Sequence, residues 1–73
     1  MDYTKRLRAL REDNDYLQRE IAELLNVGQR TYADSELGKT RIPLESMIKL
    51  AKFYNVDMNY ICNVSNVKKP FPK

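Results

Sequence analysis

Apolar side chains recur at helical spacing along the chain and predict five short helices. In residues 2–13, Tyr3, Leu7 and Leu10 stand at i, i+4 and i+7, which places them on one face of a helix. Residues 44–54 repeat this pattern more fully, so we predict that they form the core helix. The other predicted helices cover residues 17–25, 29–37 and 58–63. We therefore expect an all-α fold, a compact bundle of about five short helices.

The helical pattern also predicts which side chains face the core. The inward residues of segment 17–25 are Leu17, Ile21, Leu24 and Leu25, and those of segment 44–54 are Leu44, Met47, Ile48, Leu50, Ala51 and Tyr54. Segment 29–37 differs, because its large apolar side chains are only Val27 just before it, Tyr32 and Leu37. A helix this polar gains little from packing alone, so we expect its outer face to be used in binding.

Turn-forming residues separate the predicted helices. Asn26 and Gly28 tolerate the irregular or left-handed backbone of a tight turn between helices. Gly38 can cap the end of segment 29–37, and Pro43 suits the first turn of the helix that follows. Asp57 is a good N-cap for the last helix. With 73 residues the chain has room for one core, and we predict a domain over residues 1–63 and a flexible, basic, Pro-containing tail over residues 64–73.

Composition argues against an enzyme. The chain has no histidine, so it cannot build the imidazole-based nucleophilic and metal sites of many enzymes. We find no metal-ligand spacing, expect no cofactor, and see no small-molecule site. Cys62 is the only cysteine, which excludes an internal disulfide, and no apolar stretch is long enough to span a membrane. We expect a soluble, cytoplasmic protein without a secretion signal or a membrane partner.

The basic charge lies at the two ends of the chain. Residues 1–11 carry a net charge of +3, residues 12–62 carry −3, and residues 63–73 carry +3. Clustered lysine and arginine can neutralise the phosphates of a polyanion. Solvated charged faces are equally common in proteins that bind no nucleic acid, so charge alone leaves both interpretations open.

Residues 18–37 contain the most informative pattern, two short helices joined by a tight turn. Ala22 is small where two crossing helices must approach closely, and the apolar residues that the helices would share are Ile21, Leu25, Val27 and Tyr32. This window, with Arg6-Leu-Arg8, Glu36-Leu-Gly-Lys39 and the stretch from Lys49 to Val56, resembles the phage-repressor and Cro-like (XRE) family. The resemblance covers about residues 3–61.

The resemblance implies a lambda-repressor-like helix-turn-helix domain that regulates transcription, usually as a repressor. Members of the family bind operator DNA mostly as two-fold dimers, so the expected partners are double-stranded DNA and a second copy of the chain. In this motif the second helix enters the major groove. That helix is segment 29–37 here.

The resemblance also assigns site residues. Gln29 and Arg30 match positions that read base edges, where glutamine pairs with adenine and arginine with guanine. Asp34 matches a third such position, although a carboxylate near phosphates is repelled unless it accepts from a cytosine amino group. The alternative is that these are solvated polar side chains.

Positions that hold the DNA backbone are implied on both sides of the reading helix. Gln18 matches a residue that binds a phosphate, with helix capping as its alternative role, and the loop residues Lys39, Thr40 and Arg41 match a segment that follows the phosphates. Glu36 resembles a structural acid paired with a basic residue of the first helix, here Arg6 or Arg8.

Three positions depart from the family pattern. Leu17 stands where a capping Thr or Ser is common, Gly28 replaces a common Ser, and Ser35 replaces an apolar or aromatic residue. These changes predict a weakly capped and thinly packed reading helix. An alternative function is therefore a protein-interaction module, antitoxin-like or anti-regulator, that keeps the fold and uses the tail with Phe71, or Ile61 and Cys62, as its surface.

Overall fold

Five helices follow one another in the computed structural model, which describes residues 3–72. They are α1 (Tyr3–Asp13), α2 (Gln18–Leu24), α3 (Gln29–Glu36), α4 (Leu44–Tyr54) and α5 (Met58–Ile61). Within this range there is no strand, so the predicted all-α class is confirmed, and the helix ends agree with prediction to within two residues. The predicted start at Asp2 and the last tail residue, Lys73, lie outside the described residues.

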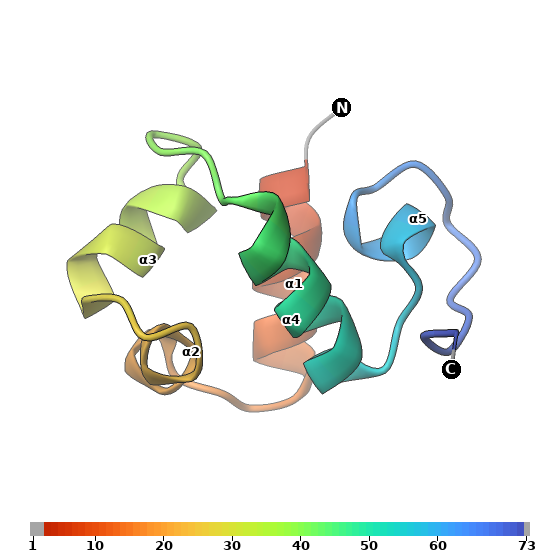
Figure 1. Ribbon diagram of the computed structural model, residues 1–73, viewed down its shortest axis with the longest axis horizontal. Coiled ribbons are helices and arrows are strands. Elements are labelled where there is room, and N and C mark those ends of the chain that lie inside the picture. The colour runs from red at the N-terminus through yellow and green to blue at the C-terminus, as the bar shows by residue number, and fades with distance from the viewer. Residues whose placement is uncertain (1–2, 73) are drawn as a thin grey trace.

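The helices form two groups around a centre made by α1 and α4 (Figure 1). On one side α2 packs against α3, and α1 contacts α3. On the other side α5 packs against both α1 and α4, and the C-terminal segment runs beside it. The α2–α3 pair therefore projects from one end of the molecule, with only its inner face held by the bundle.

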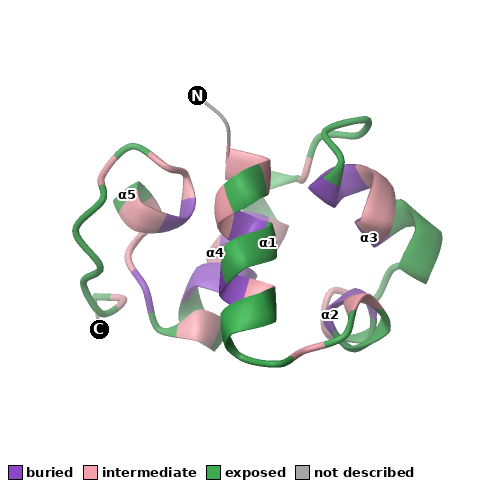
Figure 2. Ribbon diagram, turned by 180° about the vertical axis from the view of Figure 1, so that it is seen from behind, coloured by how far each residue is buried: buried purple, intermediate pink, exposed green. Residues whose placement is uncertain are grey.

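The core takes residues from every helix (Figure 2). Its buried hydrophobic members are Leu7, Leu10, Ile21, Ala22, Tyr32, Met47, Leu50, Ala51, Val56 and Ile61. The predicted stripes of α1 and α4 are confirmed at most positions. Burial of these side chains is the main favourable contribution to folding.

Four apolar residues expected to pack inward or between helices are exposed instead, and Val27, at 39%, is the least exposed of them. Leu17 is 52% exposed, because it is the N-cap of α2 and its extended backbone takes it off the helical stripe. Leu44 is 68% exposed, since it is the first residue of α4 and lies beyond the end of the core. Leu37, the C-cap of α3, is 65% exposed.

The predicted turn residues take the expected backbone conformations at several positions. Asn26 and Gly38 have φ values of 58° and 81°, in the left-handed region. The Asp57 carboxylate accepts a hydrogen bond from the Tyr60 N–H at 2.8 Å, so it caps α5 as predicted. Gly28 differs, because its φ of −69° needs no glycine. Among residues 3–72, no helix has the length and apolar character needed to cross a membrane.

Candidate nucleic-acid interface

The α2–α3 pair has the geometry of two helices joined by a tight turn. The turn is closed by the Val27 N–H, which donates to the Ala22 carbonyl at 2.9 Å, and by left-handed Asn26. Ala22 is 2% exposed, as expected for a small residue at a helix crossing. Tyr32 anchors α3 to the core with 1% exposure. The outer face of α3 is left free to contact another molecule.

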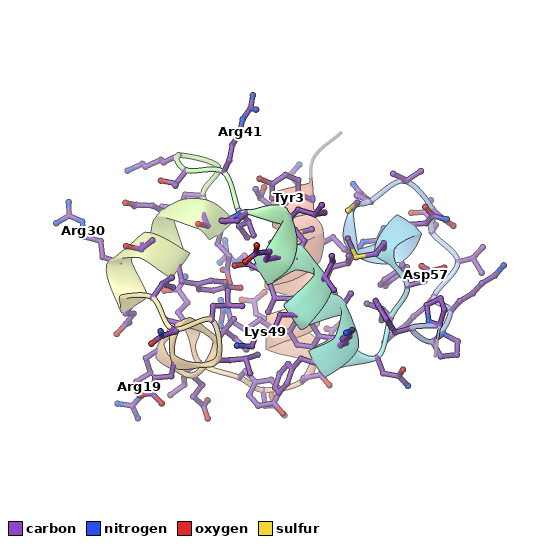
Figure 3. The ribbon with its side chains drawn as sticks, viewed as in Figure 1. Tyr3, Arg19, Arg30, Arg41, Lys49 and Asp57 are labelled. Carbon is purple, nitrogen blue, oxygen red and sulfur yellow. The ribbon has the colours of Figure 1, made fainter. Side chains whose placement is uncertain are left out.

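The three predicted base-reading residues lie on α3. Gln29 and Arg30 are exposed and Asp34 is half-buried. Arg30 and Asp34 are one turn apart and share the outer face, and the Arg30 side chain points away from the bundle (Figure 3). Within residues 3–72, neither the Gln29 amide nor the Arg30 guanidinium has a hydrogen-bond or ion-pair partner. Both are available to an external ligand.

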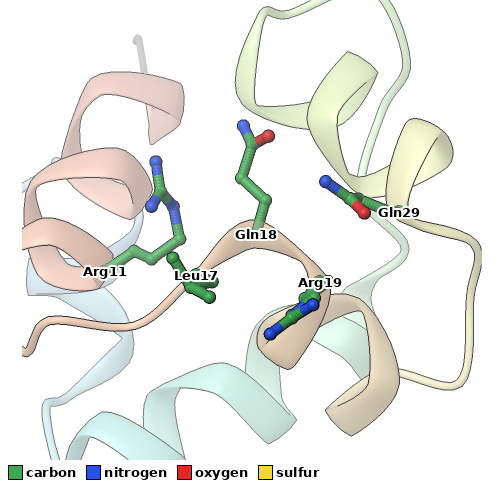
Figure 4. Close-up of a pocket in the computed structure, with 5 residues that line it drawn as sticks. All are labelled: Arg11, Leu17, Gln18, Arg19 and Gln29. Atoms are coloured by element: carbon green, nitrogen blue, oxygen red, sulfur yellow. The ribbon is translucent and has the colours of Figure 1, made fainter.

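Gln29 belongs to a shallow hollow where α1 ends and where α2 and α3 begin (Figure 4). The hollow has a volume of about 590 Å³ and is lined by Arg11, Leu17, Gln18, Arg19 and Gln29. It brings together Gln18 and Gln29, which were predicted to contact the DNA backbone and the bases, respectively. It does not include Lys39, Thr40 or Arg41.

A buried ion pair between Arg11, which lines the hollow, and Glu36 lies beside it. Arg11 Nε and Nη2 donate to the two carboxylate oxygens of Glu36, at 2.7 and 3.2 Å, and the Arg11 Nη1 donates to the Tyr16 carbonyl at 2.9 Å. Gln18 Nε2 also donates to Glu36, at 3.3 Å. The pair therefore joins α1 to α3 and holds the Gln18 side chain at the entrance of α2.

Glu36 was expected to pair with Arg6 or Arg8, and the structure corrects this to Arg11. Arg11 follows buried Leu7 by one turn, so it faces α3. Arg8 is on the exposed side and pairs with Glu12 at 3.5 Å. Arg6 points toward the opposite end of the molecule, where it contacts α5 and the C-terminal segment.

The ion pair sets the charge state of its surroundings. Burial alone would raise the pKa of Glu36, but the hydrogen bonds from Arg11 and Gln18 and the positive charge of Arg11 together hold that pKa below its ordinary value. The hydrogen bond to Glu36 raises the pKa of Arg11. Burial, reinforced by the Glu36 charge, raises the pKa of Tyr32. At neutral pH the pair is fully ionised and Tyr32 is neutral.

The loop predicted to follow the phosphate backbone lies after α3. Lys39, Thr40 and Arg41 are all exposed, and the loop starts with the Lys39 N–H donating to the Asp34 carbonyl at 2.9 Å. Arg41 extends away from the body of the protein (Figure 3). Thr40 and Arg41 line a second pocket, of about 200 Å³, which also includes Tyr32 and Ser35 of α3.

The three departures from the family pattern have different structural consequences. Neither Leu17 nor Gly28 supplies a side-chain cap, but the Glu20 carboxylate accepts from the Leu17 N–H at 2.8 Å. Ser35 is buried, and its hydroxyl donates to the Thr31 carbonyl at 3.0 Å. The weak capping of α3 is therefore confirmed, whereas Ser35 is satisfied within the helix.

Two residues at the hollow were missed by the sequence interpretation. Arg11 carries a signal that was available, its position one turn after Leu7 on the apolar stripe. Arg19 is an exposed residue of α2, and nothing in the local sequence pattern distinguishes it from other exposed charges. In the described part of the chain, no group of three or more Cys, Asp or Glu side chains is placed to hold a metal ion.

The chain matches the sequence profile of one protein family and is similar to several transcriptional regulators. The sequence profile of the family described as "Helix-turn-helix" matches residues 7–61. The chain is 32% identical to the HTH-type transcriptional regulator ImmR of Bacillus subtilis (strain 168) over 69 residues, which cover 94% of this chain and 54% of ImmR. It is 41% identical to the cryptic phage CTXphi transcriptional repressor RstR of Vibrio cholerae over 54 residues, 74% of this chain and 49% of RstR.

A third relative is the uncharacterized HTH-type transcriptional regulator YobD of Bacillus subtilis (strain 168), 28% identical over 93% of this chain and 61% of YobD. The chain thus spans about half the length of the curated relatives it matches. No solved structure matches it. With the family profile covering α2, the turn and α3 together with most of the remaining bundle, the chain belongs to the phage-repressor and Cro-like (XRE) helix-turn-helix family.

Proposed function

We propose that this chain is a sequence-specific regulator of transcription that binds double-stranded DNA through α3. The observation that carries the proposal is the pair of exposed, unpartnered side chains, Gln29 and Arg30, at the start of the second helix of a helix-turn-helix. In this motif the second helix lies in the major groove and its N-terminal residues contact base edges. Gln29 would pair with adenine, Arg30 with guanine, and Asp34 with a cytosine amino group.

Contacts to the DNA backbone would fix the orientation of α3. Gln18 lies across the hollow from Gln29, where one strand would pass (Figure 4). The exposed loop Lys39, Thr40 and Arg41 would follow the phosphates beyond the other end of α3. Such contacts position a protein on the duplex without reading sequence.

We further propose that the protein acts in the cytoplasm as a repressor and binds an inverted-repeat operator as a homodimer. The name of the similar protein RstR, a phage transcriptional repressor, supports repression. A two-fold dimer of this motif places its two reading helices about 34–36 Å apart, one turn of DNA.

Selection of bound duplexes from a random-sequence pool at near-physiological salt tests the proposal. We expect enrichment of an inverted repeat with half-site centres about 10 base pairs apart. Enrichment of a single half-site would contradict the proposed homodimer but would still support base reading by α3. No enrichment would reject the proposed function for this chain and favour the protein-interaction module.

The roles of two residues can then be separated on the selected site. Arg30→Ala should cost about 1–3 kcal/mol of binding free energy and relax one base position. Lys39→Ala should weaken binding to all sequences alike and lower the salt slope by about one. Equal losses on every sequence from both variants would contradict base reading by Arg30.

The alternative function is a protein-interaction module. The side chains expected to form its binding surface are less exposed than the sequence analysis implied. Ile61 is fully buried, and Cys62 and Phe71 are half-buried against the core. Within the described residues Val64 and Val67 are the exposed apolar side chains near α5, at 63% and 57%. They are the positions to substitute if selection finds no preferred DNA.

A further inference from the structure

The hollow of Figure 4 contains two arginines, and intramolecular contacts use only one of them. Arg11 is bound to Glu36 and to the Tyr16 carbonyl, and its side chain is 13% exposed. Arg19 is exposed, and its guanidinium has neither a hydrogen bond nor an ion pair with any residue from 3 to 72. The hollow therefore has one uncommitted cation.

The acidic residues on the same helix leave the Arg19 charge unneutralised. Glu20 is adjacent, but its carboxylate accepts the Leu17 N–H at 2.8 Å. Glu23 is one turn further along α2, at the spacing of a helical ion pair, yet it forms no ion pair with Arg19. Glu36, the acid on α3 that contacts Gln18, is bound to Arg11.

The position of Arg19 is continuous with the proposed DNA face. It lines the hollow together with Gln18 and Gln29, so it shares this surface with one residue proposed to hold the backbone and one proposed to read a base. Figure 3 shows Arg19 and Arg30 extending from the same side of the molecule, away from the bundle. A duplex whose major groove receives α3 would present the bordering phosphates to this hollow.

Guanidinium chemistry selects the atom that Arg19 would contact. Its planar fork of N–H donors matches the oxygens of a phosphate, and an exposed arginine loses less hydration than a lysine would on forming such a contact. Because every nucleotide carries the same phosphate, the contact would add affinity without base preference.

We propose that Arg19 binds a phosphate of the DNA strand that borders the groove occupied by α3. The proposal rests on the proposed function, and it adds a residue on α2 to the positioning contacts of Gln18 and of the loop after α3. It extends the DNA interface across the hollow, from the reading helix to the helix before it.

The salt dependence of binding tests this proposal, with Lys49→Ala as the matched control for Arg19→Ala. Lys49 is also an exposed cation, but it belongs to α4 and lies outside the hollow (Figure 3). Loss of one phosphate contact should reduce the slope of log K against log salt concentration by about 0.9. Between 50 and 200 mM salt the affinity of Arg19→Ala should therefore fall about 3-fold less than that of the wild type. Lys49→Ala should keep the wild-type slope.

A neutral phosphate substitute locates the contact. Duplexes that carry one methylphosphonate at successive backbone positions should show a position where the wild type loses affinity and Arg19→Ala loses none. Arg19→Lys should retain most of the salt slope, because a lysine can also bind a phosphate as a point charge. On selected and unrelated duplexes alike, Arg19→Ala should weaken binding by the same factor, roughly 3- to 10-fold at physiological salt.

The outcomes separate this proposal from the proposed function. If the wild type selects an operator and Arg19→Ala has the slope and the methylphosphonate profile of the wild type, the Arg19 contact is wrong and the proposed function stands. If Arg19→Ala changes binding to some sequences and not others, Arg19 reads bases and the phosphate contact is also wrong. If the wild type binds no duplex at all, both proposals fail.

Discussion

The Arg11–Glu36 pair is the residue-level feature on which the α2–α3 unit depends. It joins α1 to the end of α3 with a bidentate contact, and its two side chains are 13% and 3% exposed. Removing one partner of a buried pair leaves the other charge uncompensated. The pair therefore fixes how the two helices meet the bundle, and through Gln18 it also orders the hollow.

We predict that Glu36→Gln lowers the free energy of unfolding by about 3 kcal/mol at pH 7, because Arg11 loses its counter-charge. The folded pKa of Glu36 is below its ordinary value of 4.5. The stability that ionised Glu36 contributes is therefore fully present above the pKa of this carboxyl in the unfolded chain. It is lost as the pH falls through the pKa of Glu36 in the folded protein. Chemical unfolding at a series of pH values should show the difference between wild type and variant shrinking below about pH 4.5.

A matched control for this change is Glu12→Gln, in the exposed pair with Arg8. Exposed pairs contribute about 0.2–1 kcal/mol, so Glu12→Gln should have a small effect at every pH. A Glu36→Gln destabilisation that is equally large at pH 7 and at pH 3 would contradict the charged role of Glu36.

At the scale of the elements, the two glycines flanking α3 have opposite requirements. Gly28, the N-cap, has φ −69° and ψ 153°, and an added Cβ would lie 3.9 Å from its nearest neighbour, Thr31 Oγ1. Gly38 has φ +81°, which L-residues rarely adopt, although the space around it is also open. The first glycine weakens the helix and the second is needed to end it.

We predict that Gly28→Ser raises the free energy of unfolding by about 0.5–1 kcal/mol, because the hydroxyl can accept a free N–H in the first turn of α3 and the unfolded chain loses entropy. Gly38→Ala should lower it by about 1–2 kcal/mol through left-handed strain. Urea unfolding midpoints measure both. If both variants shift the urea midpoint in the same direction, capping and backbone strain do not determine the stability of α3.

The bounds of the helices were predictable from the sequence where residues that start or end a helix mark them. α4 has the predicted bounds because Pro43 and left-handed Asn55 mark its two ends. The partner of Glu36 was not predicted correctly, because three arginines of α1 are equivalent in a sequence motif. Only the rotation of α1 about its axis, fixed by burial of Leu7 and Leu10, decides that Arg11 faces α3.

The site was predictable as far as the family motif extends, and no further. Gln18 and Gln29 are 11 positions apart in the sequence, yet they line one hollow because the turn at Asn26 brings the starts of α2 and α3 together. Whether an exposed charge such as Arg19 shares that hollow depends on the crossing of the two helices. No local sequence pattern encodes that crossing.

At the scale of the whole molecule, the C-terminal segment contacts the bundle far from α3. The Asp57 N–H donates to the Lys69 carbonyl at 2.8 Å, and the Phe71 N–H donates to Asn55 Oδ1 at 3.3 Å. Lys52 Nζ is 5.6 Å from the centre of the half-buried Phe71 ring. These contacts favour a docked segment, whereas the composition of residues 64–73 predicts a flexible one.

Arg6 holds the beginning of the same segment. Its Nη2 donates to Asn63 Oδ1 at 2.7 Å and to Asn66 Oδ1 at 2.9 Å, and its guanidinium lies 3.9 Å from the centre of the Tyr60 ring. A cation over an aromatic ring adds about 0.5–1 kcal/mol at an exposed site. Arg6 therefore links α1, α5 and the C-terminal segment at the end of the molecule opposite the proposed DNA face.

Hydrogen exchange at Asp57 distinguishes a docked segment from a flexible one. In the wild type we expect the Asp57 amide to be protected by its bond to the Lys69 carbonyl. Phe71→Ala removes about 1–2 kcal/mol of apolar burial from the segment, so exchange at Asp57 should become roughly tenfold faster. The adjacent Val56 amide, which donates to the Ala51 carbonyl at 2.9 Å within the bundle, should keep its protection. An Asp57 amide that exchanges at the rate of an unstructured chain in the wild type would show that the segment is flexible, and the domain would then end near Asn63.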